Sequence, residues 1–117
     1  MGQTVSFDID GTLAEGLFAP GNILSMRTRP AIIHVLRVLM KAGYRIRIVT
    51  ARPERYRDDT VAWLRRHAVP YHEIRMRSAG DNRPDPALRA EQTDGVRVHF
   101  DDKPENCAAV RVRCVRV

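Results

Sequence analysis

Apolar and polar positions alternate with two different periods along the chain, and the order of these periods predicts an α/β fold. Short apolar runs are typical of buried strands, and apolar residues spaced three and four apart are typical of amphipathic helices. We expect strands at residues 4–8, 45–50, 71–76, 96–100 and 111–117. We expect one helix to begin at Pro30 and end before Gly43, and others to span residues 53–67, 84–91 and 104–109.

The first two predicted helices have distinct apolar faces. Proline suits the first position of a helix, as at Pro30, and glycine suits the position after its end, as at Gly43. The residues expected to be buried are Ile32, Ile33, Val35, Leu36, Leu39 and Met40 in the first helix, and Tyr56, Thr60, Trp63 and Leu64 in the second. Residues 9–29 form a Gly- and Pro-containing excursion, within which residues 13–18 are a candidate hairpin.

Strands that alternate with helices predict a parallel sheet that is covered on both faces. The length of 117 residues and the apolar fraction of 44% suit one small domain, at residues 1–117, with a packed core. The polar loop at residues 81–85 is not expected to divide this domain. The chain therefore leaves little room for a second domain over a site.

The formal net charge of +6 and the pI of about 10.1 have two interpretations. A basic surface can bind a polyanion such as DNA or RNA. Alternatively, the charge reflects a compositional bias, because every lysine or arginine except Lys41 and Lys103 is an arginine. The arginines are spread along the chain, so charge alone does not decide between the two.

Other features of the composition indicate a cytoplasmic protein. No stretch is long and apolar enough to cross a membrane, and the N-terminus lacks the basic and apolar regions of a signal peptide. Cys107 and Cys114 have neither the spacing of a zinc finger nor a CxxC pattern. We expect both to be free thiols in a reducing cytosol, where a disulfide is disfavoured.

Two carboxylates, Asp8 and Asp10, follow directly on the first apolar run and precede a Gly-Thr turn. Residues two apart on a strand point the same way, and open α/β sheets bind ligands at the carboxyl ends of their strands. Converging carboxylates repel each other, and a divalent cation such as Mg²⁺ would offset their charge. The pair suits a carboxylate nucleophile with a second carboxylate as acid and base. The alternative is an exposed turn with two solvated acids.

Two further strand ends carry candidate residues. The hydroxyl of Thr50 can donate to a phosphoryl oxygen, and Arg52 can make a bidentate contact with phosphate; alternatively, Thr50 caps the next helix and Arg52 is a surface residue. Asp101 and Asp102, followed by Lys103, would complete an oxygen-rich metal site. Their alternative role is to cap the helix that begins at residue 104.

These segments resemble the motifs of the haloacid dehalogenase-like (HAD) superfamily of aspartate-nucleophile phosphatases. The resemblance rests on Phe7-Asp8-Ile9-Asp10-Gly11-Thr12-Leu13, Val49-Thr50-Ala51-Arg52, Arg89 and His99-Phe100-Asp101-Asp102-Lys103. It implies a Rossmann-like three-layer sandwich without a cap domain. Asp8 would be the nucleophile and Asp10 the acid and base. Mg²⁺ would be held by Asp8, the Asp10 backbone carbonyl and Asp102, with Asp101 orienting a metal-bound water.

The third quarter of the chain narrows the resemblance. This stretch is similar to the 3′-phosphatase domain of phage-type polynucleotide kinase-phosphatase, and it reads Arg77-x-x-Gly80-Asp81-x-Arg83-x-Asp85 followed by Arg89. Asp85 and Arg89 are four residues apart, so on a helix they share a face and can pair. The functional set this implies is Asp8, Asp10, Arg52, Arg77, Asp85, Arg89, Asp101 and Asp102, with Arg83 and Lys103 as auxiliaries. Most family members have lysine in place of Arg89. The sequence contains no phosphate-binding Gly-Lys-Ser/Thr loop of the kind that a kinase has. The segment after Leu13 is shorter than in the family, and the basic residue that the family has in that segment has no evident counterpart here.

The resemblance implies a Mg²⁺-dependent phosphomonoesterase that removes 3′-phosphates from nucleic-acid ends, with Thr50, Arg52, Arg77, Arg83 and Arg89 binding phosphate or substrate and Asp85, Asp101 and Lys103 supporting them. The alternatives are a phosphatase of nucleotides or sugar phosphates, and a binding module without activity. The sequence leaves open DNA versus RNA, Mg²⁺ versus Mn²⁺, the oligomeric state and any associated kinase or ligase.

Overall fold

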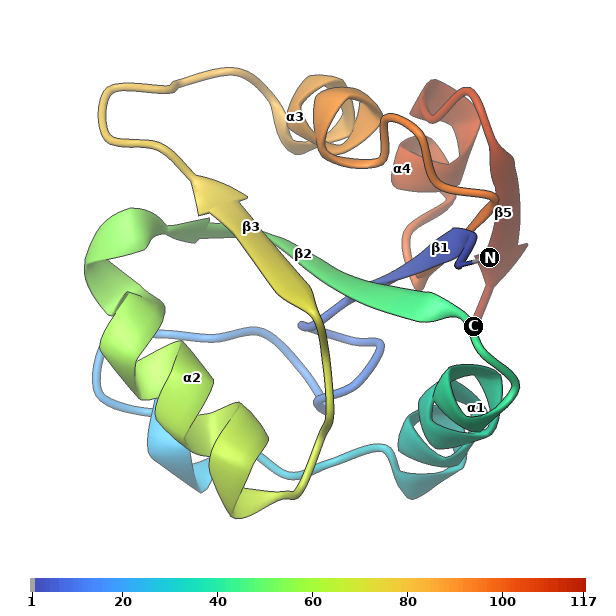
Figure 1. The fold of residues 1–117 in the computed structure, drawn as a ribbon. Helices are drawn as coiled ribbons and strands as arrows, with labels where there is room; N and C mark the ends of the chain where they lie inside the picture. Colours follow the sequence, from blue (N-terminus) through green and yellow to red (C-terminus); the bar gives the residue numbers. More distant parts are fainter. Residues whose placement is uncertain (1) are drawn as a thin grey trace.

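The predicted parallel sheet is present, and its strands lie in the order β3-β2-β1-β4-β5 (Figure 1). The computed structural model describes residues 2–117. The strands are β1 (Thr4–Asp8), β2 (Arg45–Pro53), β3 (Glu73–Arg77), β4 (Val98–Asp101) and β5 (Arg113–Arg116). Every neighbouring pair is parallel. Because β1 is central, its carboxyl end lies between those of β2 and β4.

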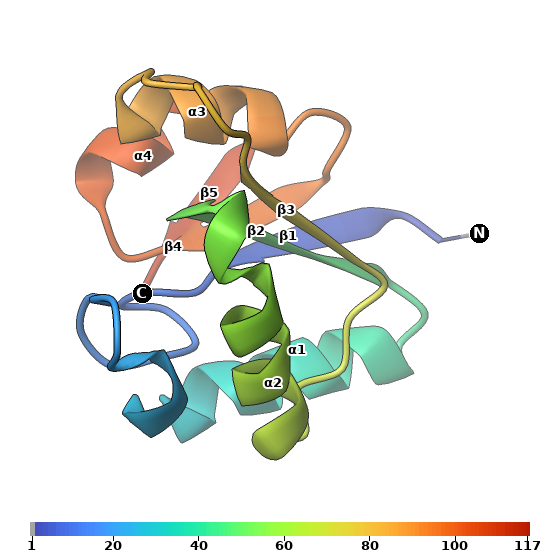
Figure 2. The ribbon, with the colours of Figure 1, turned by 90° about the vertical axis from the view of Figure 1, so that its left-hand side faces the viewer.

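Helices cover both faces of the sheet, which makes the molecule the expected three-layer sandwich. Figures 1 and 2 show α1 (Pro30–Lys41) and α2 (Arg57–Arg66) on one face, and α3 (Asp85–Gln92) and α4 (Pro104–Ala109) on the other. Two 3-10 turns, η1 (Ile23–Ser25) and η2 (Glu54–Tyr56), precede α1 and α2. Within the described residues, no helix is long and apolar enough to span a bilayer.

The core lies mainly between the sheet and the α1–α2 layer. Ile33 and Leu36 of α1 and Trp63 and Leu64 of α2 are buried against it, as their helical spacing predicts. The indole nitrogen of Trp63 donates to the carbonyl of Met26 over 2.9 Å, so this buried donor is satisfied. The prediction for Val35 is wrong, because 36% of this residue is exposed.

The candidate hairpin at residues 13–18 is not present. The segment holds only isolated bridges, from Ala14 to Asp10 and to Thr28. Leu13 and Ala14 are both fully buried, whereas a hairpin would turn every second side chain toward solvent. The segment is instead a tight turn after β1 that leads into a loop.

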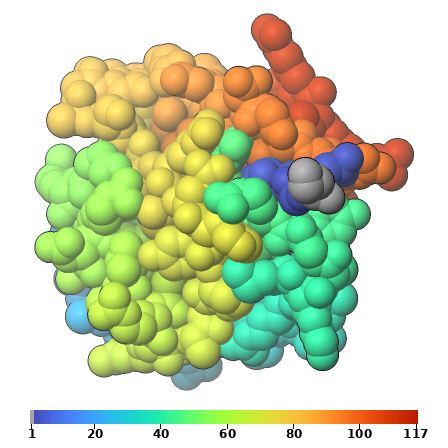
Figure 3. Space-filling model, viewed as in Figure 1, coloured from blue at the N-terminus to red at the C-terminus, as the bar shows by residue number. Residues whose placement is uncertain are grey.

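The predicted boundaries shift by a few residues at most elements. Strand β2 continues through Pro53, and the turn η2 then delays α2 until Arg57, whereas the sequence predicts that helix from residue 53. Strands β3, β4 and β5 and helix α3 differ from their predicted ranges by one or two residues at their ends. In the space-filling view, edge strand β3 and the segment leading into it lie at the surface between α2 and α1 (Figure 3).

Cys107 and Cys114 form a disulfide, so the prediction of free thiols is wrong. Helix α4 ends two residues after Cys107, and the chain then runs back as β5, which carries Cys114. This return brings the two Cα atoms to 5.3 Å, within the range of about 4.4–6.8 Å that disulfides span. The separation of seven residues matches no common cysteine motif, so only the fold reveals the pairing.

Replacing both cysteines by serine should lower the free energy of unfolding by about 2 kcal/mol, because the cross-link restricts the unfolded chain over a short loop. For a chain of this length the melting temperature should fall by about 10 °C. Calorimetry of the oxidised protein, the reduced protein and the double variant checks this. Equal melting temperatures for all three would contradict it.

Candidate active site

The carboxyl ends of β1, β2 and β4 open into a cavity of about 220 Å³. It lies where the structure of open α/β sheets places ligand sites, beyond the carboxyl edge of the central strands. The residues that line it are Asp8, Asp10, Leu17, Phe18, Ala51, Arg52, Asp85, Arg89, Lys103 and Asn106. Six of these, Asp8, Asp10, Arg52, Asp85, Arg89 and Lys103, belong to the functional set predicted from the sequence.

The turn after β1 is shaped by Gly11. Its φ is +83°, and a Cβ atom there would lie 2.1 Å from Oδ2 of Asp102. Only glycine combines this backbone conformation with so close an approach to another side chain. The carbonyl of Ile9 accepts the N–H groups of Thr12, Leu13 and Ala14 and closes the turn. The turn at Gly11 thus brings the end of β1 directly against the loop that follows β4.

Asp8 ends β1 at the base of the cavity and is only 4% exposed. Nη1 of Arg89 lies 3.1 Å from its Oδ1 and also donates to the carbonyl of Val49 over 2.9 Å. Burial raises the pKa of Asp8 well above its usual range, the Arg89 charge opposes this, and the charges of neighbouring carboxylates add to the rise. The site therefore holds more negative charge than Arg89 offsets.

Oxygen atoms of Asp8, Asp101 and Asp102 lie within 4.8 Å of one another, a group that could hold a metal ion. Carboxylate oxygens are the donors that hard divalent cations such as Mg²⁺ prefer. A cation here would stabilise the charged form of Asp8, whose pKa is raised by burial and further by the neighbouring carboxylates. The residues present therefore fit a divalent metal, and Thr12 supports one of them by donating to Oδ1 of Asp102 over 3.5 Å.

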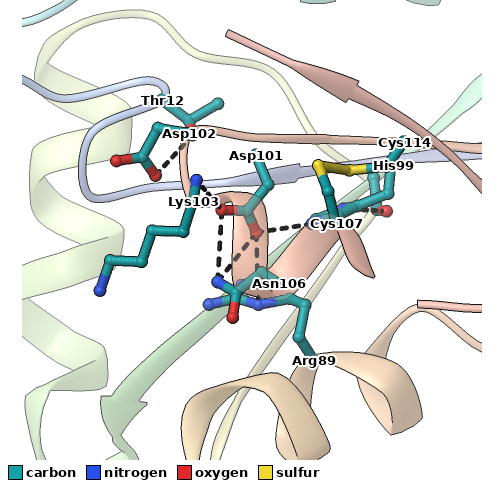
Figure 4. Close-up of a disulfide and its surroundings, with 10 residues drawn as sticks. Thr12, Arg89, His99, Asp101, Asp102, Lys103, Asn106, Cys107 and Cys114 are labelled. Atoms are coloured by element: carbon teal, nitrogen blue, oxygen red, sulfur yellow. Dashed lines mark hydrogen bonds and ion pairs between the residues drawn. A yellow bond between two sulfur atoms is a disulfide. The ribbon is translucent and has the colours of Figure 1, made fainter. Parts of the chain in front are cut away.

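Asp101 is fully buried and is surrounded by donors (Figure 4). Nε2 of His99 lies 2.8 Å from its Oδ2, the backbone N–H of Lys103 donates to Oδ1 over 3.1 Å, and the Asn106 amide donates to both oxygens over 3.3 Å. Burial raises the pKa of Asp101, but the hydrogen bond from His99 and the Arg89 charge bring it below its usual value. Asp101 is therefore an anion at neutral pH.

His99 connects Asp101 to the interior of the sheet, a role that the sequence interpretation missed. Its Nδ1 lies 2.7 Å from the hydroxyl of Ser6 on β1. Burial lowers the pKa of His99, so the neutral ring donates from Nε2 to Asp101 and accepts from Ser6. The sequence could have indicated this contact, because His99 and Asp101 are two residues apart on β4 and side chains two apart on a strand share a face.

Asp10 is held by Arg52, which is fully buried. Nη2 of Arg52 donates to Oδ1 over 2.7 Å and Nε donates to Oδ2 over 3.1 Å, a bidentate pair. Nη1 of Arg52 donates to the hydroxyl of Thr60 over 3.1 Å. The orientation of the Asp10 carboxylate is therefore fixed from α2 through Arg52. The predicted contact of Arg52 with phosphate would be made in addition to this ion pair.

Thr50 is almost fully buried, and its hydroxyl accepts the backbone N–H of Arg52 over 3.1 Å. It shapes the end of β2 and caps neither η2 nor α2, whose N-termini have no side-chain cap, so the capping alternative is wrong. Its contact with phosphate stays a prediction, as does metal binding by the Asp10 backbone carbonyl. The Asp10 carboxylate itself is directed at Arg52.

Arg77 and Arg83, expected to bind substrate, do not line the cavity. Arg77 fixes the loop between β3 and α3, donating to the carbonyls of Ala51, Asp81 and Arg83 and to Oδ1 of Asp85 over 2.7 Å. Arg83 pairs with Asp81 over 2.7 Å and lowers the pKa of Asp81 to about 2. The predicted pair of Asp85 with Arg89 is replaced by the pair with Arg77.

Solved structures share the fold of this chain. A putative HAD-like phosphatase from Mesorhizobium loti has a TM-score of 0.64 over 92% of this chain and 66% of its own, at 15% identity. The fold and the carboxylate site at the end of β1 define a phosphatase of the HAD superfamily. Within it, the chain belongs to the family described as the polynucleotide kinase PNKP phosphatase domain, whose model matches residues 2–116.

Other relatives match parts of much longer chains. A structure of the Pnkp1/Rnl/Hen1 complex has a TM-score of 0.87 at 21% identity, covering all of this chain and 46% of its own, and a structure of the Pnkp1/Rnl/Hen1 RNA repair complex gives 0.86 at 22% identity, covering 99% of this chain and 42% of its own. Membrane-associated phosphatidylinositol transfer protein 3 of mouse and human is 32% identical over 68 residues, 58% of this chain. The chain spans only 7% of the length of these curated relatives.

Proposed function

We propose that this domain removes 3′-phosphates from nucleic-acid ends, with Mg²⁺, through an aspartyl-phosphate on Asp8. The observation that carries the proposal is the pair of aspartates at the base of the cavity. Asp8 is buried beside Arg89, and Asp10 is fixed by the bidentate contact with Arg52. The family match to polynucleotide kinase PNKP phosphatase domains supports the choice of substrate.

In the first step, an oxygen of Asp8 attacks the phosphorus of the phosphomonoester, and the bond from phosphorus to the sugar oxygen breaks. Asp10 donates its proton to the leaving alkoxide. In the second step, Asp10 accepts a proton from water as the water oxygen attacks the phosphorus of the aspartyl-phosphate. Inorganic phosphate leaves, and the Asp8 carboxylate and the protonated Asp10 are restored.

The positive groups around the two aspartates have separate roles. Arg89 contacts Asp8 and is placed to bind an oxygen of the incoming phosphate. Lys103 lines the same cavity and can contact a second oxygen. Arg52 fixes the direction in which Asp10 gives and takes the proton.

We propose that Asp8, the backbone carbonyl of Asp10, and Asp102 hold the metal ion, with Asp101 beside them. A bound Mg²⁺ would supply positive charge that offsets the negative charge of the carboxylates and the phosphate. His99 and Asn106 keep Asp101 anionic and correctly oriented at the edge of this cluster.

The cavity suits the end of a polymer, since no second domain covers it within the described residues 2–117. The net charge of +6 favours a polyanionic substrate. A different observation favours the second candidate, a phosphatase of small phosphomonoesters. Arg77 and Arg83, the arginines expected to grip a nucleic acid, are engaged by the β3–α3 loop and by acidic side chains.

The test is phosphate release from a 3′-phosphorylated oligonucleotide, its 5′-phosphorylated counterpart and a mononucleotide 3′-phosphate, each with Mg²⁺ and with a chelator. We expect release mainly from the oligonucleotide 3′ end, and only with metal. Equal or better cleavage of the mononucleotide would contradict the proposal in favour of the second candidate. No release from any of them would contradict both.

A further inference from the structure

A large apolar side chain lies exposed at the rim of the catalytic cavity. Leu17 is 66% exposed, the most exposed large hydrophobic residue among those described, and it lines the same cavity as Asp8 and Asp10. The base of this cavity is built from aspartates and arginines. Single exposed leucines are common on protein surfaces, but at the rim of a ligand site such a side chain can be covered by the ligand, which removes apolar surface from water.

The loop that carries Leu17 is held in place by its own contacts. The side chain of Asn22 accepts the N–H of Ala19 over 2.6 Å and donates to the carbonyl of Leu17 over 3.4 Å. The ring of Phe18 packs edge-on against Tyr56 at 5.6 Å. The loop therefore presents Leu17 in a defined position.

The same loop is tied to the catalytic groups. The guanidinium carbon of Arg52 lies 5.3 Å from the centre of the Phe18 ring, and Arg52 also holds Asp10. Leu17 thus lies next to the residues that act on the leaving alkoxide. A group attached to the sugar that bears this alkoxide can therefore reach the rim where Leu17 lies.

The size of the cavity places the rest of the substrate outside it. Its volume of about 220 Å³ is below the range of about 300–1,000 Å³ that is typical of pockets enclosing a whole small ligand. The phosphate and the sugar next to it would fill this volume. The base of the terminal nucleotide would then lie at the rim. The flat apolar face of this base can pack against the leucine side chain there, whereas the groups at the bottom of the cavity are charged.

We propose that Leu17, backed by Phe18, forms a subsite for the base of the nucleotide that carries the scissile phosphate. This inference rests on the proposed 3′-phosphatase function and names a determinant of its specificity. The subsite contacts the face of the base, so it does not select one base over another. It favours an end that carries a base over an abasic end.

The experiment compares two oligonucleotides that differ only at the 3′-phosphorylated terminus, one with a base and one abasic. The ratio of their kcat/KM values is measured for wild type, Leu17→Ser, Leu17→Trp and Leu24→Ser. Leu24 is the matched control, because it is 41% exposed and lines a separate surface hollow with Arg66 and His67.

We expect wild type and Leu24→Ser to prefer the end with a base by about five- to tenfold, the scale set by covering most of one leucine side chain. In Leu17→Ser this ratio should approach one, through a higher KM for the end with a base. Leu17→Trp should keep or increase the preference, because bases stack on aromatic rings.

The outcomes separate this inference from the function on which it rests. A wild-type ratio near one, an unchanged ratio in Leu17→Ser, or the same loss in Leu24→Ser would overturn the subsite while 3′-end activity remained. Failure of wild type to release phosphate from either end would overturn the proposed function and the subsite with it.

Discussion

Asp8→Asn should abolish phosphate release, with a loss of about 10⁴-fold or more, and should raise the melting temperature of the metal-free protein by a few degrees. The amide cannot form the aspartyl-phosphate, so the covalent route is closed. The gain in stability follows from the raised pKa of Asp8, which means that its buried charge opposes folding at neutral pH. Loss of activity together with gain in stability distinguishes a catalytic residue from a structural one.

Asp94→Asn is the control for this substitution. Asp94 is exposed after α3, and the same change there should alter neither activity nor stability. Melting is followed by circular dichroism in a chelator, and activity is measured with Mg²⁺ on the substrate that wild type cleaves best. Substantial turnover by pure Asp8→Asn protein would refute the assignment of the nucleophile.

Arg52→Lys should lower kcat by about 10²- to 10³-fold, the scale of a displaced general acid and base. Lysine cannot make the two parallel contacts that hold both oxygens of Asp10, and it cannot also reach the hydroxyl of Thr60. The variant should also be less stable, because a lysine replaces a fully buried, hydrogen-bonded arginine. Steady-state kinetics and thermal melting measure the two effects.

The kinetic parameter that changes decides between two roles for Arg52. If Arg52 acts through Asp10, as the geometry indicates, kcat falls and KM changes little. If it binds phosphate directly, as the sequence predicts, KM rises by a comparable factor. Arg55→Lys is the control, because Arg55 lies exposed on η2 over the Tyr56 ring.

The convergence of the acids was predictable from the sequence because it depends on the backbone. Parallel strands end at one edge of the sheet, and residues two apart on a strand share a face. Asp8, the last residue of β1, therefore had to meet Asp101 and Asp102 once β1 and β4 were neighbours, whereas Asp10 lies beyond the end of the strand and its carboxylate is directed at Arg52. The place of Arg89 at the site was predicted from the resemblance to the HAD motifs, and its predicted partner Asp85 pairs with Arg77 instead.

The partners of the long basic side chains were not predictable in this way. An arginine can reach many acceptors, and several backbone carbonyls of the β3–α3 loop compete for Arg77. A pattern of residue types does not contain the positions of these carbonyls. His99 was missed for a related reason, since its partners, Ser6 and Asp101, become neighbours only when the strands pair.

The disulfide bears on how the protein is handled at the bench. Cys107 directly follows Asn106, which bonds to Asp101, and Cys114 lies opposite His99 in the register of β4 and β5. Reductant in a storage buffer would remove the cross-link between β5 and the short helix α4, which carries Asn106. A sample kept in dithiothreitol and one kept in air are therefore different preparations, and phosphatase assays of the two should be recorded separately.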